Sequence, residues 1–201
     1  MKEKILDTST EMFLSLGFKS VTMDDIADKL SISKKTIYSH FSNKEQLVEA
    51  CVLELFEEIS TNIDDIVAEN HNPIAEQLYI HEFILNKLKE ENASPQFQLY
   101  KYYPEINEKL REKKIEHTEK CLSKNLTRGI KEGFYRDDIE IKLVLNFYFM
   151  TLEGIKNSDF FSMENYPISF LIKHFLEYHF RAIVSEKGLK YINSLKHKKS
   201  I

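Results

Sequence analysis

The sequence predicts an all-α protein with a small N-terminal head of three helices and a larger C-terminal helical domain, about nine helices in total. Three observations lead to this fold class. The 201 residues include only five glycines and four prolines, which favours long helices joined by few turns. Apolar residues recur at helical spacing along nearly the whole chain. The alternation of apolar and polar residues that marks a strand is not found, and neither is an internal repeat.

The composition is that of a globular protein from a reducing compartment. Apolar residues make up 42% of the chain and charged residues 30%. Two cysteines, Cys51 and Cys121, provide no disulfide framework, so we expect a cytoplasmic protein. The most apolar stretch, residues 143–155, is interrupted by Asn146 and Glu153. It is too short to span a bilayer, so no membrane association is expected.

Charge is distributed unevenly along the chain, and this bears on its partners. Residues 1–47 carry seven lysines and seven acidic residues, which gives a net charge of zero. Residues 48–186 have a net charge of −9, and residues 187–201 have a net charge of +5. The acidic middle repels nucleic-acid phosphates, so any contact with DNA is expected at the two ends of the chain.

The first two helices of the head have clear boundaries in the sequence. Apolar residues from Ile5 to Leu16 recur at helical spacing, and Gly17 is expected to end that helix. Thr22 then has the spacing of a capping box with Asp25, which predicts the start of a second, short helix.

A short turn joins the second helix to a third, in the arrangement of a helix-turn-helix. Ser33 is a good N-cap for the third helix. Ile37 and Phe41 are expected to face inward, which leaves the polar side chains between them exposed. Ser42 and Glu45 have the spacing of a second capping box, which starts another helix immediately afterwards. A helix of the third helix's size fits the major groove of DNA.

These features resemble the DNA-binding domain of the TetR family, the tetracycline-repressor-like bacterial regulators. The similarity is strong over residues 1–47 and extends over the rest of the chain only in length and helical rhythm. Ser31 departs from the family pattern, in which glycine is usual, and serine in a left-handed turn costs about 1 kcal/mol. The matching residues are Phe13, Gly17, Phe18, Thr22, Ile26, Ala27, residues 32–41, Lys44, Glu45 and Leu47.

The resemblance implies a transcriptional regulator that binds a pseudo-palindromic, double-stranded DNA operator as a homodimer, without a cofactor and most often as a repressor. It also implies two domains, residues 1–47 for DNA binding and residues 48–201 for effector binding and dimerisation. Partial burial in the core is an alternative for Tyr38. The residues expected to contact phosphates or base edges are Thr22, Ser33, Lys34, Lys35, Thr36, Tyr38, His40 and Lys44.

The remainder of the chain is expected to be helical throughout. An apolar stripe from Val48 to Ile66 predicts a long helix, which Asn72 and Pro73 stop. Later helices are expected over residues 73–91, 95–103, 104–132, 138–157 and 166–186, with a break at residues 133–135.

The last two of these helices are apolar over wide faces, which predicts that a second copy of the chain covers them. In the TetR family, the final two helices of each subunit typically form a four-helix bundle. The residues assigned to the dimer interface are Tyr148, Leu152, Leu171, Phe175 and Tyr178.

Aromatic residues of the second domain have two interpretations, a simple core or the lining of a cavity for a small-molecule effector. The residues assigned to the cavity are Phe97, Tyr100, Tyr103, Phe134, Asn146 and Phe147.

Other interpretations stay open at this point. The second domain could bind a protein partner without a small-molecule effector. His117 and Cys121 could share a helix face as metal ligands, but no further ligands accompany them, so no metal site is expected. No catalytic motif is present, so an enzyme is not expected. The basic tail, residues 187–199, is expected to be a disordered end, or else a source of non-specific attraction to DNA.

Overall fold

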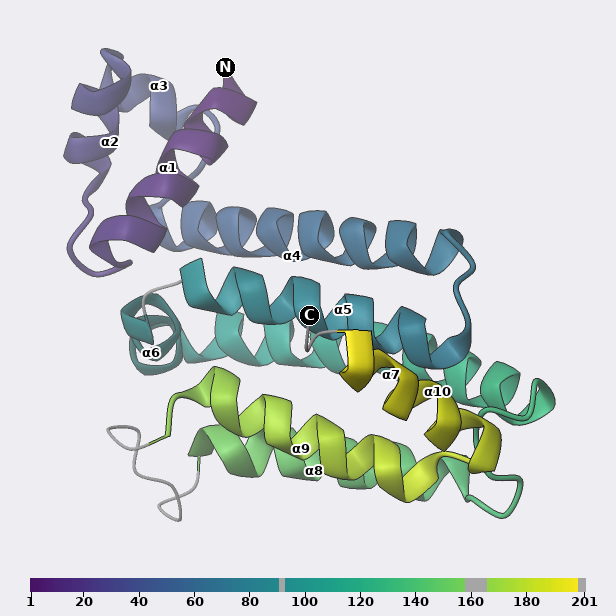
Figure 1. The fold of residues 1–201 in the computed structure, drawn as a ribbon. Coiled ribbons are helices and arrows are strands. Elements are labelled where there is room, and N and C mark those ends of the chain that lie inside the picture. Colours follow the sequence, from purple (N-terminus) through teal and green to yellow (C-terminus); the bar gives the residue numbers. More distant parts are fainter. Residues whose placement is uncertain (91–92, 158–165, 199–201) are drawn as a thin grey trace. The chain divides into compact units, whose positions relative to one another are not determined.

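The computed structural model describes residues 1–90, 93–157 and 166–198, and within these ranges the predicted all-α fold is confirmed. No strand forms in this part of the chain, although Tyr135 and Val184 make an isolated antiparallel bridge. None of the described helices combines the length and the apolar character that crossing a bilayer requires. The helices of Figure 1 are α1 (Lys2–Leu16), α2 (Met23–Leu30), α3 (Lys34–Tyr38), α4 (Lys44–Ala68), α5 (Pro73–Glu90), α6 (Ala93–Tyr102), α7 (Pro104–Lys131), α8 (Ile141–Asn157), α9 (Ile168–Ile183) and α10 (Glu186–Lys198).

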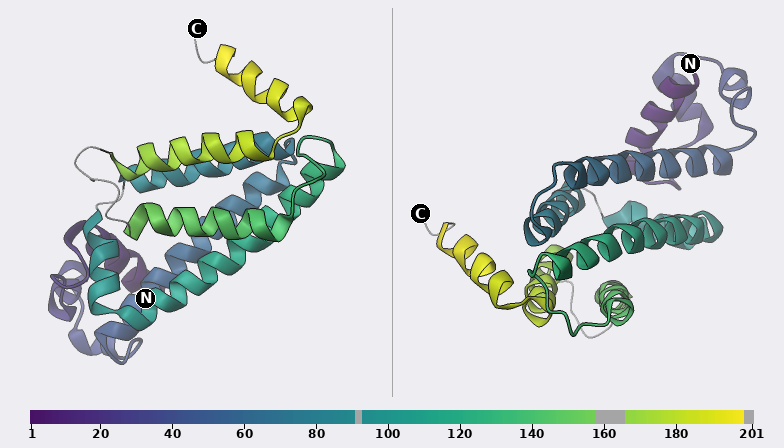
Figure 2. Two further views of the ribbon diagram at one scale, coloured as in Figure 1. Left: turned by 90° about the horizontal axis from the view of Figure 1, so that it is seen from below. Right: turned by 90° about the vertical axis from the view of Figure 1, so that its right-hand side faces the viewer.

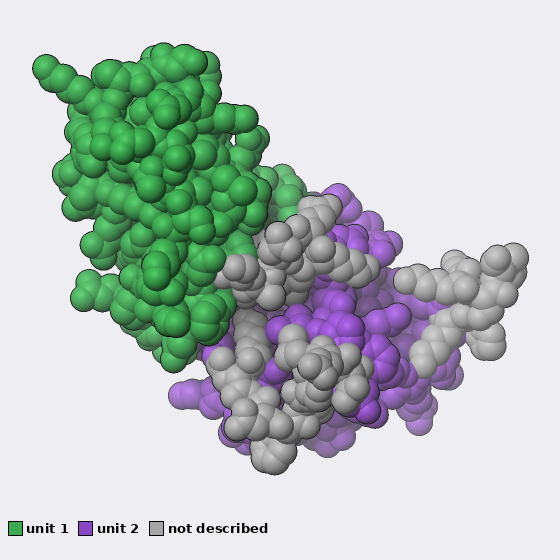
Figure 3. Space-filling model, turned by 90° about the vertical axis from the view of Figure 1, so that its left-hand side faces the viewer, with its two compact units in different colours: residues 1–65, 87–114 green, residues 66–86, 115–201 purple. Residues whose placement is uncertain are grey.

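The chain forms two compact units, which Figure 3 shows in different colours. Unit 1 consists of residues 1–65 and 87–114, and unit 2 consists of residues 66–86 and 115–201. Helices α4, α5 and α7 therefore each contribute residues to both units. The predicted domain boundary after residue 47 separates DNA binding from effector binding and dimerisation, whereas the two units are defined by packing. This predicted boundary stays a prediction.

The core of unit 1 is formed by the apolar faces of α1 to α4. Ile5 and Phe13 on α1, Ile26 on α2, Ile37 on α3 and Leu47 on α4 are all fully buried. Burying a side chain of this size contributes about 1.5–3 kcal/mol. Isolated helices as short as α2 and α3 are marginal in water, so these helices depend on their shared core.

The turn between α1 and α2 is anchored on α6, within unit 1. Gly17 ends α1 as predicted, with a φ of 89°. This positive φ favours glycine, and a Cβ atom at position 17 would also displace the amide end of the Gln98 side chain, which lies 2.4 Å away. The Lys19 N–H donates to Oε1 of Gln98 at 2.8 Å, and the rings of Phe18 and Tyr103 meet with centroids 6.3 Å apart. The position of the turn is thus determined by α6 as well as by α1.

A buried polar network in unit 2 ties the start of α5 to α7. Glu76 is 3% exposed and accepts hydrogen bonds from Arg128 at 2.6 Å and from Asn125 at 2.7 Å. Asn125 is 2% exposed; it donates to the Pro73 carbonyl at 2.9 Å and accepts from the Tyr135 hydroxyl at 2.9 Å. Because these groups satisfy one another, their burial does not leave an unpaired charge or amide in the core.

A second buried cluster in unit 2 joins α5 to α8 and α9. Helices α8 and α9 lie side by side in Figures 1 and 2. His81 donates from Nδ1 to the Gln77 carbonyl at 2.6 Å, because a carbonyl can only accept, and its Nε2 accepts from the Tyr148 hydroxyl at 3.0 Å. Burial lowers the pKa of His81 to about 4, and it lowers the pKa of His179 to about 4 as well. Both imidazoles are therefore neutral at neutral pH.

The C-terminal tail differs from the sequence-based expectation. The interpretation as a disordered end is wrong for residues 187–198, because they belong to the helix α10. The other interpretation, non-specific attraction to DNA, stays a prediction. Lys199 lies outside the described residues.

The expected helix over residues 166–186 is divided at Val184. This residue is extended, with φ −75° and ψ 147°, and it pairs with Tyr135. Ser185 then caps α10, since the Gly188 N–H donates to its Oγ at 3.2 Å. A serine followed by a glutamate is the signal in the sequence that marks this new helix start.

Candidate nucleic-acid interface

The start of α2 has the capping box that the sequence predicts. The Asp25 N–H donates to Oγ1 of Thr22 at 3.2 Å, and the Asp25 carboxylate accepts from the Thr22 hydroxyl at 2.7 Å and from the Thr22 N–H at 2.8 Å. These hydrogen bonds lower the pKa of Asp25, which keeps the carboxylate charged. Thr22 is therefore held in an exposed position at the first turn of α2.

The turn between α2 and α3 is built by two serines. Ser31 is left-handed, with φ 53° and ψ 41°, which is the conformation that the comparison with glycine implies. Ser33 is the N-cap of α3, and its Oγ accepts from the Thr36 N–H at 3.1 Å. Both predictions are confirmed, and together these residues determine the direction in which α3 leaves the turn.

Helix α3 has one buried side and one exposed side. Ile37 is fully buried in the core of unit 1, as predicted. Tyr38 is 46% exposed, so it does not belong to the core. Lys35 and His40 are exposed, and Thr36 is half-buried. The exposed side of α3 therefore carries a cation and a phenol, and the imidazole of His40 follows just after the helix; all three can donate hydrogen bonds to DNA.

Lys34, the first residue of α3, forms an ion pair with Asp24 on α2. Its Nζ lies 2.7 Å from Oδ2 of Asp24, and the two side chains are 45% and 66% exposed. Hydrogen bonding to Asp24 raises the pKa of Lys34. The sequence predicts that Asp24 favours the positive end of the α2 dipole. It does not predict the contact with Lys34, because this contact depends on the angle between α2 and α3, which residue spacing does not specify.

The predicted capping box of Ser42 and Glu45 is wrong. Asn43 is the cap instead, since its Oδ1 accepts from the Gln46 N–H at 2.8 Å, while Oε1 of Gln46 accepts from the Ser42 N–H at 2.6 Å. Asparagine is among the best N-cap residues, and the Gln46 side chain reaches back to Ser42, the residue before the cap. Helix α4 begins at Lys44, within the range that the sequence predicts.

Lys44 is half-buried at the junction between α4 and the α1–α2 turn. Its Nζ donates to the Lys19 carbonyl at 3.4 Å and lies 5.9 Å from the centre of the Phe13 ring. Partial burial lowers the pKa of Lys44. The eight expected DNA contacts thus all lie in unit 1, at the starts of α2 and α4, on α3 and in the segments beside it.

The six residues assigned to an effector cavity are divided between the two units, so each group is described within its own unit. An apolar pocket of about 70 Å³ lies in unit 1, and none of the six lines it. The pocket is formed by residues of α1, α4, α6 and α7 and by Phe18. The exposed members of the six are Phe97, Tyr100, Asn146 and Phe147, and the half-buried ones are Tyr103 and Phe134.

The five residues assigned to a dimer interface differ in exposure within the single chain. Tyr178 on α9 is 72% exposed. Tyr148 and Leu171 are buried within unit 2, and Leu152 and Phe175 are half-buried. The assignment of these residues to a dimer interface stays a prediction.

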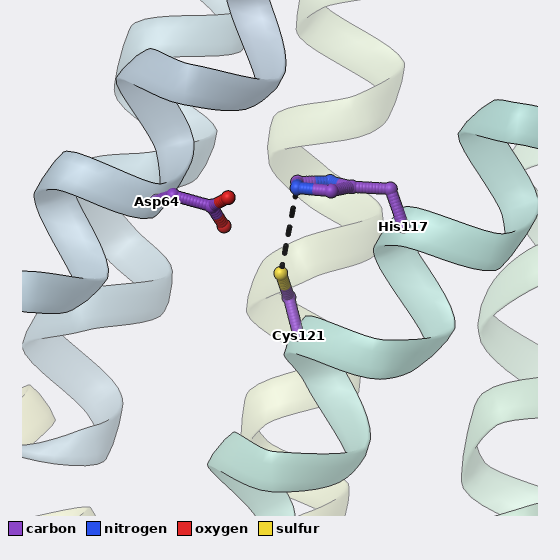
Figure 4. Close-up of side chains that lie close together, drawn as sticks. All are labelled: Asp64, His117 and Cys121. Carbon is purple, nitrogen blue, oxygen red and sulfur yellow. Dashed lines mark hydrogen bonds between the residues drawn. The ribbon is translucent and has the colours of Figure 1, made fainter. Parts of the chain in front are cut away.

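His117 and Cys121 share one face of α7, as their spacing predicts. Figure 4 shows the hydrogen bond of 3.9 Å between Cys121 Sγ and His117 Nε2. Asp64, which Figure 4 also draws, belongs to unit 1, whereas His117 and Cys121 belong to unit 2.

The fold and the interface define a class of protein, a DNA-binding helix-turn-helix protein with an additional helical domain. Comparisons with known proteins specify the family. Residues 5–51 match the family model described as "Bacterial regulatory proteins, tetR family". The HTH-type transcriptional repressor KstR2 of Mycobacterium tuberculosis is 24% identical over 151 residues, which cover 72% of this chain and 74% of that protein. The match of residues 5–51 and the similarity to a transcriptional repressor over most of the chain support a DNA-binding transcriptional regulator of the TetR family.

Solved structures share the fold over almost the whole chain. A TetR transcription regulator from Haloarcula marismortui has a TM-score of 0.73 at 19% identity, with 92% of this chain and 98% of that chain covered. The regulator FadR from Bacillus subtilis, in complex with stearoyl-CoA, has a TM-score of 0.67 at 18% identity, with 89% and 97% covered. The helical second domain is therefore part of the shared fold.

Proposed function

We propose that this regulator is a homodimeric repressor that reads a pseudo-palindromic operator with α3 in the major groove and releases it when an effector binds. The observation that carries the proposal is the exposed side of α3, where Lys34, Lys35 and Tyr38 project from a helix that is capped by Ser33 and anchored by the buried Ile37. Such side chains reach phosphates and base edges. The chain acts by binding, and no catalytic step is part of this proposal.

Selection of DNA fragments by the purified full-length protein tests the operator proposal. We expect enrichment of one palindromic site whose half-sites lie about one turn of DNA, ~34 Å, apart. Enrichment of single, unpaired half-sites would contradict the dimeric mode of reading. Enrichment of nothing above background at moderate salt would contradict operator recognition itself.

The proposed dimer uses α8 and α9, as the family resemblance implies. Leu143, Phe147 and Met150 follow one another at helical spacing on α8 and are 52%, 57% and 65% exposed. A contiguous apolar row of this kind is uncommon on the surface of a monomer. Tyr178 on the neighbouring α9 is exposed as well. We propose that a second copy of the chain covers these side chains.

Glutamate at both Phe147 and Met150 is expected to convert the dimer to monomers, because two charges would be buried without partners at the interface. Sedimentation equilibrium at micromolar concentration measures the mass directly. Leu189→Glu on α10 is the control, since Leu189 is also exposed but lies on another helix, and this variant should stay dimeric. A dimeric double variant would show that the α8 row is not the interface.

We propose a small-molecule effector, on the ground that the similar FadR structure holds stearoyl-CoA. The pocket of about 70 Å³ in unit 1 is smaller than typical ligand sites of roughly 300–1,000 Å³, so a ligand that fills such a site would enter this pocket only if the pocket enlarged. The selected operator provides the test. A ligand that demonstrably binds the protein but leaves operator affinity unchanged would refute effector control.

A further inference from the structure

The ion pair between Asp24 and Lys34 places an acidic residue at the proposed DNA interface, where a negative charge weakens binding. DNA phosphates repel a carboxylate, and Asp24 is 66% exposed beside the helix that is to enter the groove. Its neighbour Asp25 has a structural task, because it closes the capping box with Thr22. Asp24 takes no part in that box, although a carboxylate in the first turn of α2 also interacts favourably with the helix dipole.

The geometry of the pair points to a second role for Asp24. Lys34 Nζ and Asp24 Oδ2 are 2.7 Å apart, so a donor and an acceptor are presented side by side. In a G·C base pair, guanine O6 accepts from the cytosine N4 amino group over about 2.9 Å, as in an ordinary N–H···O hydrogen bond. Guanine O6 and N7 accept from lysine in the major groove, and the free hydrogen of cytosine N4 is donated to an acidic side chain. The donor and acceptor of the protein therefore match those of one base pair in both chemistry and spacing.

The same ion pair weakens the interaction of Lys34 with a backbone phosphate. A lysine that is not held by a carboxylate neutralises a phosphate at any sequence, and this releases counterions. Lys34 carries three N–H donors and can reach a phosphate while one of them stays on Asp24, but the Asp24 carboxylate beside it then opposes the phosphate, so the pair neutralises less phosphate charge than a lone lysine. Hydrogen bonding between the two residues also raises the pKa of Lys34, so the lysine stays charged while it is paired.

We propose that Asp24 is a specificity-determining residue of the DNA interface: together with Lys34 it reads one G·C base pair in each half-site and suppresses binding to non-specific DNA. This inference rests on the proposed operator function. It adds an acidic residue of α2 to an interface that otherwise consists of neutral and basic side chains.

The test compares Asp24→Asn with Asp28→Asn. Asp28 is an exposed acidic residue on the same helix, so its replacement removes the same charge from α2 without touching the pair. Each protein is used to select operator variants, and its affinity for a random duplex is measured at several salt concentrations. Circular dichroism checks that the variants are folded.

For Asp24→Asn we expect three changes that Asp28→Asn does not show. The preference for a G·C pair at one position of each half-site disappears. Affinity for the random duplex rises by about 3–10-fold, and the slope of log affinity against log salt becomes steeper by about one, because Lys34 now neutralises a phosphate. In a Lys34→Gln background, Asp24→Asn should no longer steepen the slope.

The outcomes separate this inference from the function on which it rests. A wild-type protein that selects an operator, combined with an Asp24→Asn variant that behaves as Asp28→Asn does, overturns the inference alone. The same holds if Asp24→Asn steepens the slope equally with and without Lys34. A wild-type protein that selects no site at all removes the operator function and the inference with it.

Discussion

Alanine at Lys34, Lys35 and Tyr38 together is expected to weaken operator binding by roughly 1,000-fold or more, because each lost base or phosphate contact costs about 1–3 kcal/mol. The three side chains are exposed on α3 and contribute little to the core of unit 1. The thermal unfolding midpoint should therefore change little. Fluorescence anisotropy with a labelled operator measures the loss.

A matched control uses lysines outside the head. Lys120 and Lys124 are both exposed on α7, and their joint replacement by alanine removes the same charge as replacement of the two lysines on α3. Operator affinity should then change by less than about tenfold, since only long-range attraction is lost. Equal losses in the two variants would mean that α3 contributes only through net charge and does not enter the groove.

Replacement of Arg128 by alanine is expected to destabilise the fold by about 3 kcal/mol, because it removes the cation that pairs with a buried carboxylate. Glu76 is 3% exposed and would keep its hydrogen bond from Asn125 but lose its ion pair. For a chain of this length, the unfolding midpoint should fall by roughly 6–12 °C. Calorimetry or circular dichroism during heating provides the measurement.

Arg181 supplies the comparison for that variant. It pairs with Glu177 one turn away on α9, at 3.3 Å, and both side chains are well exposed. An exposed pair of this kind contributes about 0.3–0.5 kcal/mol, so Arg181→Ala should leave the midpoint almost unchanged. If the two arginine variants unfold at the same temperature, the network around Glu76 does not stabilise unit 2 in the way argued above.

Local features of the head are predictable from the sequence because their physics is local. Thr22 with Asp25, Ser33 as a cap and Gly17 as a helix end each depend on residues within one turn of chain, and all three are observed. The error at the start of α4 has the same origin. Two cap residues compete there, and Asn43 is used rather than Ser42.

Features that depend on distant parts of the chain are not predictable in this way. The break between α9 and α10 has a local signal in the cap residue Ser185, but the extended conformation of Val184 accompanies its bridge to Tyr135, which lies far away in the sequence. The ion pair between Asp24 and Lys34 depends on the angle between α2 and α3, which the spacing of residues does not specify. The effector residues were chosen by residue type alone, and type does not distinguish the exposed Tyr100 from the buried Tyr135.

The anchoring of the α1–α2 turn on α6 has a consequence for protein engineering. A chimera that joins residues 1–47 to a foreign sensor domain would discard Gln98 and Tyr103, against which Lys19 and Phe18 pack. The DNA-binding head of such a chimera would then lack these contacts unless the foreign domain replaced them. A graft that carries residues 87–114 together with residues 1–65 would take its own support with it.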